Sequence, residues 1–192
     1  AGAGITGAEM AQRVLREHGV TDVAVISTGG ELTDHYDPRS KVIKLSSEVY
    51  GSRSVSALGV ACHEAGHAVQ HAQSYFPLVA RNAFVPVVNF CSGISWIVLI
   101  VGLFMQYDLM INLGIILFAT SAVFQFITLP VEFNASRRAV ASLKNSGMLS
   151  DSEIAGTKKV LTAAAMTYVA ALATTLASLL RLILITRGNR RN

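Results

Sequence analysis

Three long apolar runs dominate the later part of the chain. They extend over residues 85–105, 109–129 and 160–186, and each is long enough to cross roughly 30 Å of hydrocarbon as a helix. Within them Arg181 is the only charged residue. The pattern therefore predicts three transmembrane helices.

A smaller, more polar region precedes these runs. Thr6 followed by Glu9 is a capping-box pattern that opens an amphipathic helix ending near Gly19. The segment DVAVIS has β-type composition, and LTDHYDPRSKVIKLS is typical of two strands joined at the Asp-Pro-Arg-Ser turn. A further helix, capped near Ser52 or Ser54, is predicted over SVSALGVACHEAGHAVQHAQ.

Composition and charge support a membrane protein. The chain is 52% hydrophobic and 15% charged, with a mean hydropathy of +0.47, which is too apolar for a typical soluble domain. Residues 1–81 hold seven Lys and Arg and residues 130–159 hold five, against at most four on the other side. This asymmetry predicts that both segments face the cytoplasm, although Arg187, Arg190 and Arg191 blur it. No basic stripe interleaved with aromatics is present, so we expect no nucleic-acid partner.

The N-terminus and the two cysteines bear on targeting and on the redox compartment. The N-terminal AGAGITGAEMAQ lacks a basic-then-apolar run, so no cleavable signal peptide is predicted. Cys62 and Cys91 fall in a motif helix and an apolar run, which argues against a disulfide and favours a reducing compartment.

The segment CHEAGHAVQHA holds three of the five histidines. His63 and His67 are four residues apart, so both imidazoles project from one helix face within reach of one ion. In an HExxH pattern two such histidines hold Zn²⁺, and the glutamate, here Glu64, is the general base for a water that the metal activates. The alternative is a surface helix with incidental histidines, but its small apolar neighbours would bury these polar groups.

A catalytic zinc requires a third protein ligand and an open fourth position. His71 lies eight residues beyond His63, about 12 Å along a helix axis, so a structural role is favoured for it. Glu132 is the better candidate, because a charged residue at the edge of a membrane helix needs a partner that a cation would provide. The alternative is an ion pair of Glu132 with Arg137 or Arg138.

Three segments, LTDHYDPRSKVIKLSSEVY, GVACHEAGHAVQHAQSYFPLVAR and LPVEFNASRRA, together resemble the YugP-type membrane neutral zinc metallopeptidases. The resemblance runs through nearly the whole chain and implies an integral membrane protein with a gluzincin-like site. His63 and His67 match the family's HExxH ligands, Glu64 its catalytic glutamate and Glu132 its downstream ligand. Members usually begin with another hydrophobic segment, so we expect a preceding anchor to be missing from this sequence.

The more distant Ste24/HtpX-like membrane proteases carry a similar EFxAD element, whose aspartate orients a ligand histidine. This chain has Ser136 at that place. Ser136, Asn134 or another group is therefore open for the supporting role.

The segment LTDHYDP has two interpretations. The resemblance suggests that it faces the active-site cleft, where His35 would stabilise the developing oxyanion or bind the substrate, and the strands would present an edge to an extended peptide. The alternative is an Asp-Pro turn stabilised by side-chain bonds to its own backbone.

The predicted fold is a mainly α membrane protein with a small α+β cytoplasmic region, its HExxH helix packed beside a transmembrane helix bundle. The predicted parts are a small α+β region (1–53), the HExxH helix (54–76), two transmembrane helices (77–129), a cytoplasmic extension with the third ligand (130–159) and a third transmembrane helix (160–186).

The predicted function is a zinc-dependent endopeptidase of a bacterial cell membrane, with the active site facing the cytoplasm. Its partners would be the lipid bilayer and protein or peptide substrates, at membrane or juxtamembrane segments. A silent zinc-binding membrane scaffold or adaptor is the main alternative, and a site closed to solvent would distinguish it. A transporter accessory is disfavoured by the lack of a polar pathway, and hydrolysis of a non-peptide carbonyl stays open. Such a ligand set also accepts Co²⁺ or Mn²⁺.

Overall fold

The computed structural model describes residues 4–30 and 32–188. It divides into two compact units, one of residues 1–78 and 131–165 and the other of residues 79–130 and 166–192. Arg190 and Arg191, which entered the charge count, lie outside the described residues. The elements are α1 (Gly7–Glu17), β1 (Ala24–Thr28), β2 (His35–Asp37), β3 (Val42–Ser46), α2 (Ser47–Tyr50), α3 (Val55–Ala72), α4 (Phe76–Phe104), α5 (Asp108–Ser146) and α6 (Asp151–Gly188).

Helix α1 begins at the predicted capping box. The Thr6 hydroxyl accepts a hydrogen bond from the Glu9 N–H at 3.3 Å, and the Thr6 N–H donates to the Glu9 carboxylate at 2.7 Å. These bonds satisfy amide groups that the first helical turn leaves without partners. Beyond the helix, Gly19 has a φ of +70°, a left-handed conformation that glycine adopts without a Cβ penalty.

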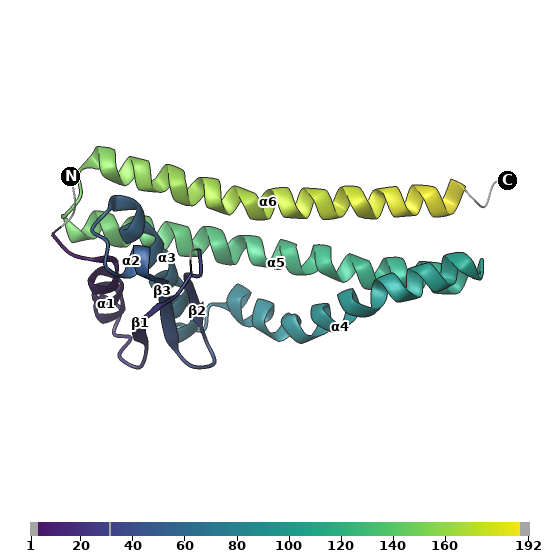
Figure 1. Cartoon of the computed structure of the whole chain (residues 1–192), viewed down its shortest axis with the longest axis horizontal. Helices are drawn as coiled ribbons and strands as arrows, with labels where there is room; N and C mark the ends of the chain where they lie inside the picture. The colour runs from purple at the N-terminus through teal and green to yellow at the C-terminus, as the bar shows by residue number, and fades with distance from the viewer. Residues whose placement is uncertain (1–3, 31, 189–192) are drawn as a thin grey trace. The chain divides into compact units, whose positions relative to one another are not determined.

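The three strands form one sheet in the order β1, β3, β2 (Figure 1). β3 lies in the centre, parallel to β1 and antiparallel to β2. Ile43 and Leu45 of β3 are fully buried and belong to the same hydrophobic cluster as residues of α1 and α3. The sheet therefore contributes one face to a small α+β core.

The predicted turn between β2 and β3 is present. Asp37 accepts hydrogen bonds from the Arg39 N–H at 2.9 Å and from the Ser40 hydroxyl at 2.7 Å. These are the local bonds expected of an Asp-Pro turn. These local bonds are sufficient to explain the turn between β2 and β3, independently of any role of His35.

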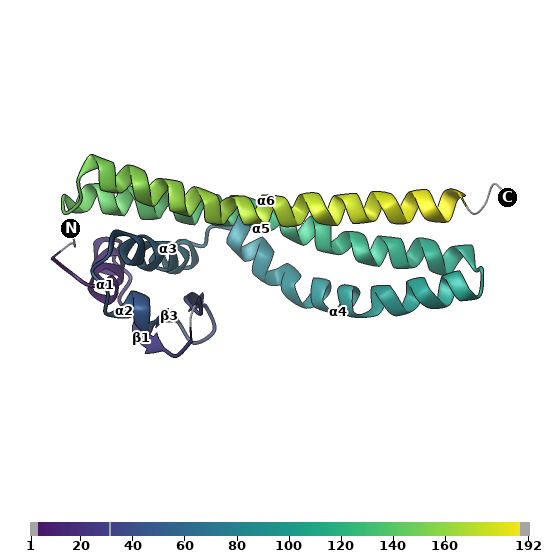
Figure 2. The ribbon, with the colours of Figure 1, turned by 45° about the horizontal axis from the view of Figure 1, so that its top comes forward.

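Helix α3 runs through the centre of this core. The Ser54 hydroxyl caps it by accepting from the Ala57 N–H at 3.2 Å, so Ser54 and not Ser52 is the cap. Helix α1 packs along α3 (Figure 2), and α3 side chains such as Leu58, Cys62 and Val69 are almost completely buried. Most of the HExxH helix is therefore a core element.

Two glycines let α3 approach the hairpin formed by the end of α5 and the start of α6. A Cβ on Gly66 would lie 3.0 Å from the Ala135 carbonyl oxygen, and one on Gly59 would lie 2.6 Å from the Thr157 methyl carbon. Larger side chains would push the helices apart. The close approach at Gly66 matters most, because Ala135 lies three residues after Glu132.

Three helices, α4, α5 and α6, are long and apolar enough to cross a membrane. In their most apolar windows only 28%, 17% and 0% of residues are buried within the protein. Their exposed side chains include large apolar ones such as Trp96, Ile100, Phe126 and Leu180. Surface of this kind is normal against lipid and costly against water.

In the second unit, α4 and α5 pack closely. The Ser92 and Ser121 hydroxyls lie 2.8 Å apart, the rings of Trp96 and Phe118 meet edge to face, and a Cβ on Gly114 would lie 2.5 Å from a Leu99 side-chain carbon. Small residues and hydroxyl bonds are how helices associate where the hydrophobic effect is weak.

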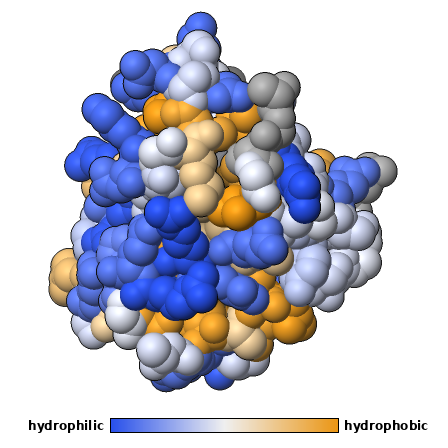
Figure 3. All heavy atoms as spheres, turned by 90° about the vertical axis from the view of Figure 1, so that its left-hand side faces the viewer, coloured by the Kyte–Doolittle hydropathy of each residue, from blue (hydrophilic) through white to orange (hydrophobic). Residues whose placement is uncertain are grey.

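Hydrophilic residues dominate the face shown in Figure 3, with hydrophobic groups between them. The mainly helical fold, the small sheet and the three long apolar helices agree with the fold predicted from the sequence. α5 continues through Pro130 to Ser146, so the predicted extension after residue 130 begins as helix. The short helix α2 was not predicted.

Candidate metal centre

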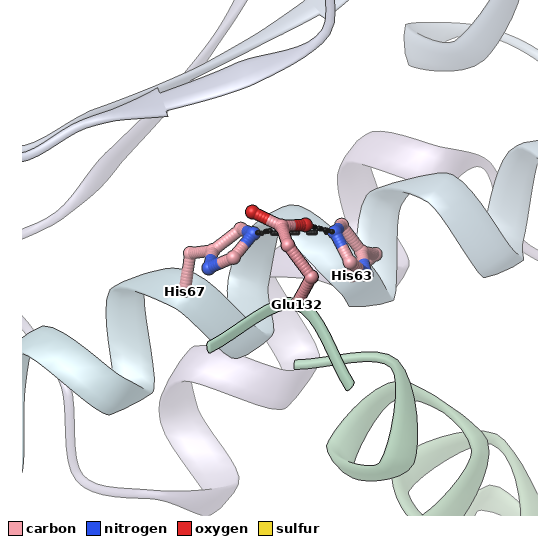
Figure 4. A group of neighbouring side chains, drawn as sticks. All are labelled: His63, His67 and Glu132. Carbon is pink, nitrogen blue, oxygen red and sulfur yellow. Dashed lines mark hydrogen bonds and ion pairs between the residues drawn. The ribbon is translucent and has the colours of Figure 1, made fainter. Parts of the chain in front are cut away.

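His63 and His67 of α3 meet Glu132 of α5, with the carboxylate between the two imidazole rings (Figure 4). The Nε2 atoms of His63 and His67 lie 3.2 Å apart. One Glu132 carboxylate oxygen lies 3.3 Å from Nε2 of His63 and 3.6 Å from Nε2 of His67. Three ligand atoms from segments far apart in sequence thus converge on one point.

These separations fit a tetrahedral zinc ion. Ligand atoms bound about 2.0–2.1 Å from a tetrahedral centre lie about 3.3–3.4 Å from one another. The three measured separations, 3.2, 3.3 and 3.6 Å, scatter around this value. Two nitrogens and one carboxylate oxygen also form a donor set that suits zinc. The arrangement could hold a metal ion without large movement of its ligands.

Gln70 fixes the orientation of His67 from behind. It is fully buried, and its Oε1 lies 3.0 Å from Nδ1 of His67. Its NH₂ group donates to the Val131 carbonyl and to the Asn134 side-chain oxygen, both at 2.9 Å. Because a backbone carbonyl only accepts, the amide must present its nitrogen to Val131 and its oxygen to His67.

This bond determines the tautomer of His67. Oε1 only accepts, so Nδ1 of His67 carries the proton and donates it to Gln70. Nε2 is then left with a lone pair that faces His63 and Glu132 when the ring is neutral. The same amide connects α3 to Val131, the residue before Glu132.

Ser136 occupies the corresponding place behind His63. Its hydroxyl oxygen lies 3.2 Å from Nδ1 of His63, which can donate to it while Nε2 faces the cluster. Of the two residues considered for the place of the EFxAD aspartate, Ser136 is the one that contacts a candidate ligand histidine directly. Asn134 acts one step further out, because it contacts Gln70 and accepts from Arg138 at 2.8 Å.

The charges in the cluster depend on one another. Burial acts to lower the pKa of His67, but its hydrogen bond to Glu132 and the negative charges of Glu64 and Glu132 outweigh burial and raise it. For Glu132, burial acts to raise the pKa, and the hydrogen bonds and charges of the two histidines hold it well below its ordinary value. Without a cation, the negative charge of Glu132 is thus stabilised by its contacts with the two histidines.

The remaining predicted residues lie as follows. Glu64 is buried and adjacent to His63, and its charge acts on His67. His71 is not part of the cluster, and its Nδ1 lies 2.7 Å from the Tyr36 hydroxyl. His35 is exposed, and its Nδ1 lies 2.7 Å from the Thr33 carbonyl oxygen. This local contact does not bear on the suggested substrate role of His35, which stays a prediction.

The ion pair considered as an alternative for Glu132 does not form among the described residues. Arg138 donates to Asn134 and, at 2.8 Å, to the Gln73 side-chain oxygen. Arg137 is exposed and pairs with no carboxylate in the part of the chain that the structure describes. Glu132 instead faces the two histidines.

Two histidines from one helix, a glutamate beside them and a distant carboxylate define the class of the HExxH metalloproteins. The chain belongs to the family described as "Putative neutral zinc metallopeptidase", whose model matches residues 1–187. It is therefore a member of a metallopeptidase family, as its sequence motifs indicated.

A curated relative supports this assignment. The chain is 49% identical over 190 residues to the "Putative membrane protease YugP" of Bacillus subtilis (strain 168), covering 99% of this chain and 84% of that protein. The comparison with solved structures finds no match.

Proposed function

We propose that the protein is a zinc-dependent endopeptidase, integral to a bacterial cell membrane, that cleaves membrane or juxtamembrane protein segments. The observation that carries the proposal is the convergence of His63, His67 and Glu132 at separations suited to one tetrahedral ion. A bound zinc ion would supply Lewis-acid activation of a water and polarisation of the scissile carbonyl.

The chain's own residues then have distinct tasks. His63, His67 and Glu132 hold the ion, while Ser136 and Gln70 keep the imidazoles in the required tautomer. Glu64 takes a proton from the attacking water and delivers it to the departing amine. Its position directly beside His63 in the sequence supports this role.

The partial solvent exposure of the candidate ligands supports a catalytic metal site over a catalytically silent zinc-binding scaffold. The side chain of His63 is 17% exposed and that of His67 11%, whereas Glu132 is 5% exposed. The cluster is therefore supported from behind and reachable from one side, as a catalytic metal site needs.

The substrate class rests on the position of Glu132 in the sequence, and the cytoplasmic orientation rests on the distribution of Lys and Arg. Glu132 follows the predicted second span by only three residues, so its ion would lie close to the membrane surface. The excess of Lys and Arg in residues 1–81 and 130–159 favours the cytoplasmic side.

The test is Glu64→Gln, with Glu48→Gln as a control at an exposed position. We expect Glu64→Gln to retain zinc and to lose about 10²- to 10⁴-fold in cleavage rate of an unfolded protein substrate, because a general base contributes that much. Zinc content is measured by elemental analysis. Wild-type cleavage by a zinc-loaded Glu64→Gln protein would contradict the assignment.

A further inference from the structure

A cavity of about 450 Å³ lies between α5 and α6 within the first unit. Its size falls within the roughly 300–1,000 Å³ range of small-molecule sites. Leu161 and Ala165 in its lining are buried, whereas Arg137, Lys144 and Lys158 are exposed. It therefore combines an apolar wall with three cations.

The three cations of this cavity have no acidic partner among the residues that the structure describes. No carboxylate lines it, and its three cations form no ion pair with any residue that the structure describes. Two carboxylates of the same helices are engaged elsewhere: Glu132 faces the two histidines, and Glu153 accepts from the Ser150 N–H and hydroxyl. Three like charges around one apolar cavity attract an anion that carries an apolar part.

The position along both helices indicates what that anion is. The second predicted span ends at Leu129 and the third begins at Val160. The cavity's α5 residues lie four to fifteen residues beyond the second span, and Leu161 and Ala165 lie in the first turns of the third. Phosphate headgroups meet acyl chains at this level of a bilayer, and basic pockets between membrane helices bind such headgroups.

We infer that the cavity binds one anionic phospholipid, with its phosphate among Arg137, Lys144 and Lys158 and an acyl chain along Leu161 and Ala165. The inference rests on the membrane insertion included in the proposed function, but not on peptidase activity. Ser136 also lines the cavity while its hydroxyl contacts His63, so the lipid would lie beside the metal centre.

The experiment uses the full chain in mild detergent and measures binding of phosphatidylglycerol and phosphatidylcholine by native mass spectrometry. The pocket variant is Arg137→Gln/Lys144→Gln/Lys158→Gln. The control, Arg16→Gln/Arg39→Gln/Lys159→Gln, removes the same charge at exposed positions outside the cavity. Each cation contributes about fivefold in affinity for an anionic lipid, so the pocket variant should lose roughly a hundredfold for phosphatidylglycerol. The control should change little.

A second pair guards against misfolding of the triple variant. Lys158→Glu reverses one charge in the cavity lining, and Lys159→Glu reverses its exposed neighbour outside it. We expect only Lys158→Glu to weaken phosphatidylglycerol binding, by at least about fivefold. Both variants should bind zinc like the wild type.

Three results would overturn the inference. The first is an equal loss of phosphatidylglycerol in the pocket and control variants. The second is displacement of the lipid by millimolar inorganic phosphate alone, which would indicate a site for a free anion. The third is unchanged lipid binding together with a selective loss of cleavage of acidic peptides in lipid-free detergent, which would indicate a substrate subsite. Lipid binding is scored without catalysis, so its failure is distinguishable from failure of the proposed function.

Discussion

Replacement of Gln70 tests whether the support behind His67 determines metal affinity. Gln70→Leu keeps a buried side chain of similar volume but removes all three hydrogen bonds of the amide. The Nδ1–H of His67 would lose its acceptor, and the Val131 carbonyl and Asn134 would each lose a donor. An unpaired buried polar group costs about 1–3 kcal/mol.

Loss of an orienting partner lowers metal affinity about 10- to 100-fold, which corresponds to about 1.4–2.7 kcal/mol. We therefore expect Gln70→Leu to bind zinc 10- to 100-fold more weakly than the wild type. Competition with a fluorescent zinc chelator measures this affinity, and thermal unfolding of the metal-free protein measures stability separately.

Two further variants separate the orienting effect of Gln70 on His67 from its contribution to packing. Gln70→Glu keeps an acceptor for His67 but has no donor for Val131 or Asn134, so it should lose stability while holding zinc within about tenfold of the wild type. Gln73→Leu is the matched control, because Gln73 is exposed and its side chain accepts a hydrogen bond from Arg138 but contacts neither histidine among the described residues. Zinc affinity of Gln70→Leu equal to that of the Gln73 control would refute the reasoning.

The other predictions concern Ser136 and pH. Ser136→Ala should weaken zinc binding about tenfold, because His63 loses its hydrogen-bond partner. Ser136→Asp should bind zinc at least as tightly as the wild type. The same chelator competition measures both affinities, and equal affinities of Ser136→Ala and the wild type would exclude a role for the hydroxyl. Because zinc requires neutral imidazoles and the pKa of His67 is raised, zinc affinity should fall as pH is lowered through that pKa. In the metal-free protein, the ion pair of Glu132 with His67 stabilises the folded state fully between pH 4.5 and pH 6.5, the ordinary pKa values of the two groups. This stabilisation is lost as the pH rises through the raised pKa of His67 or falls through the lowered pKa of Glu132. Unfolding temperatures of chelator-treated protein that do not vary with pH would contradict this linkage.

Much of the architecture was accessible from the sequence because its signals are local. The capping box at Thr6, the Asp-Pro turn and the three apolar runs each depend on neighbouring residues, and each element is present. The pairing of β1 with β3 was not predicted, because β2 lies between these two strands in the sequence and local patterns do not show which distant strands pair. The short helix α2 has no sequence signal strong enough to separate it from a turn.

The candidate ligands were accessible for a different reason. His63 and His67 share a helix face by spacing alone, while Glu132 was selected as a charge that needed a partner beside an apolar run. Gln70 was missed, although a signal exists: residues 63, 67 and 70 fall on one face of α3. A glutamine there, among small apolar residues, must find hydrogen-bond partners once buried.

The distance along the chain between the two halves of the metal cluster bears on biosynthesis. His63 and His67 leave the ribosome well before Glu132, and the apolar helix α4 and most of the apolar part of α5 are translated between them. A nascent chain that has emerged only as far as α3 carries the HExxH sequence without its third ligand. Metal binding at the proposed three-residue site therefore requires that the second apolar helix has already been made.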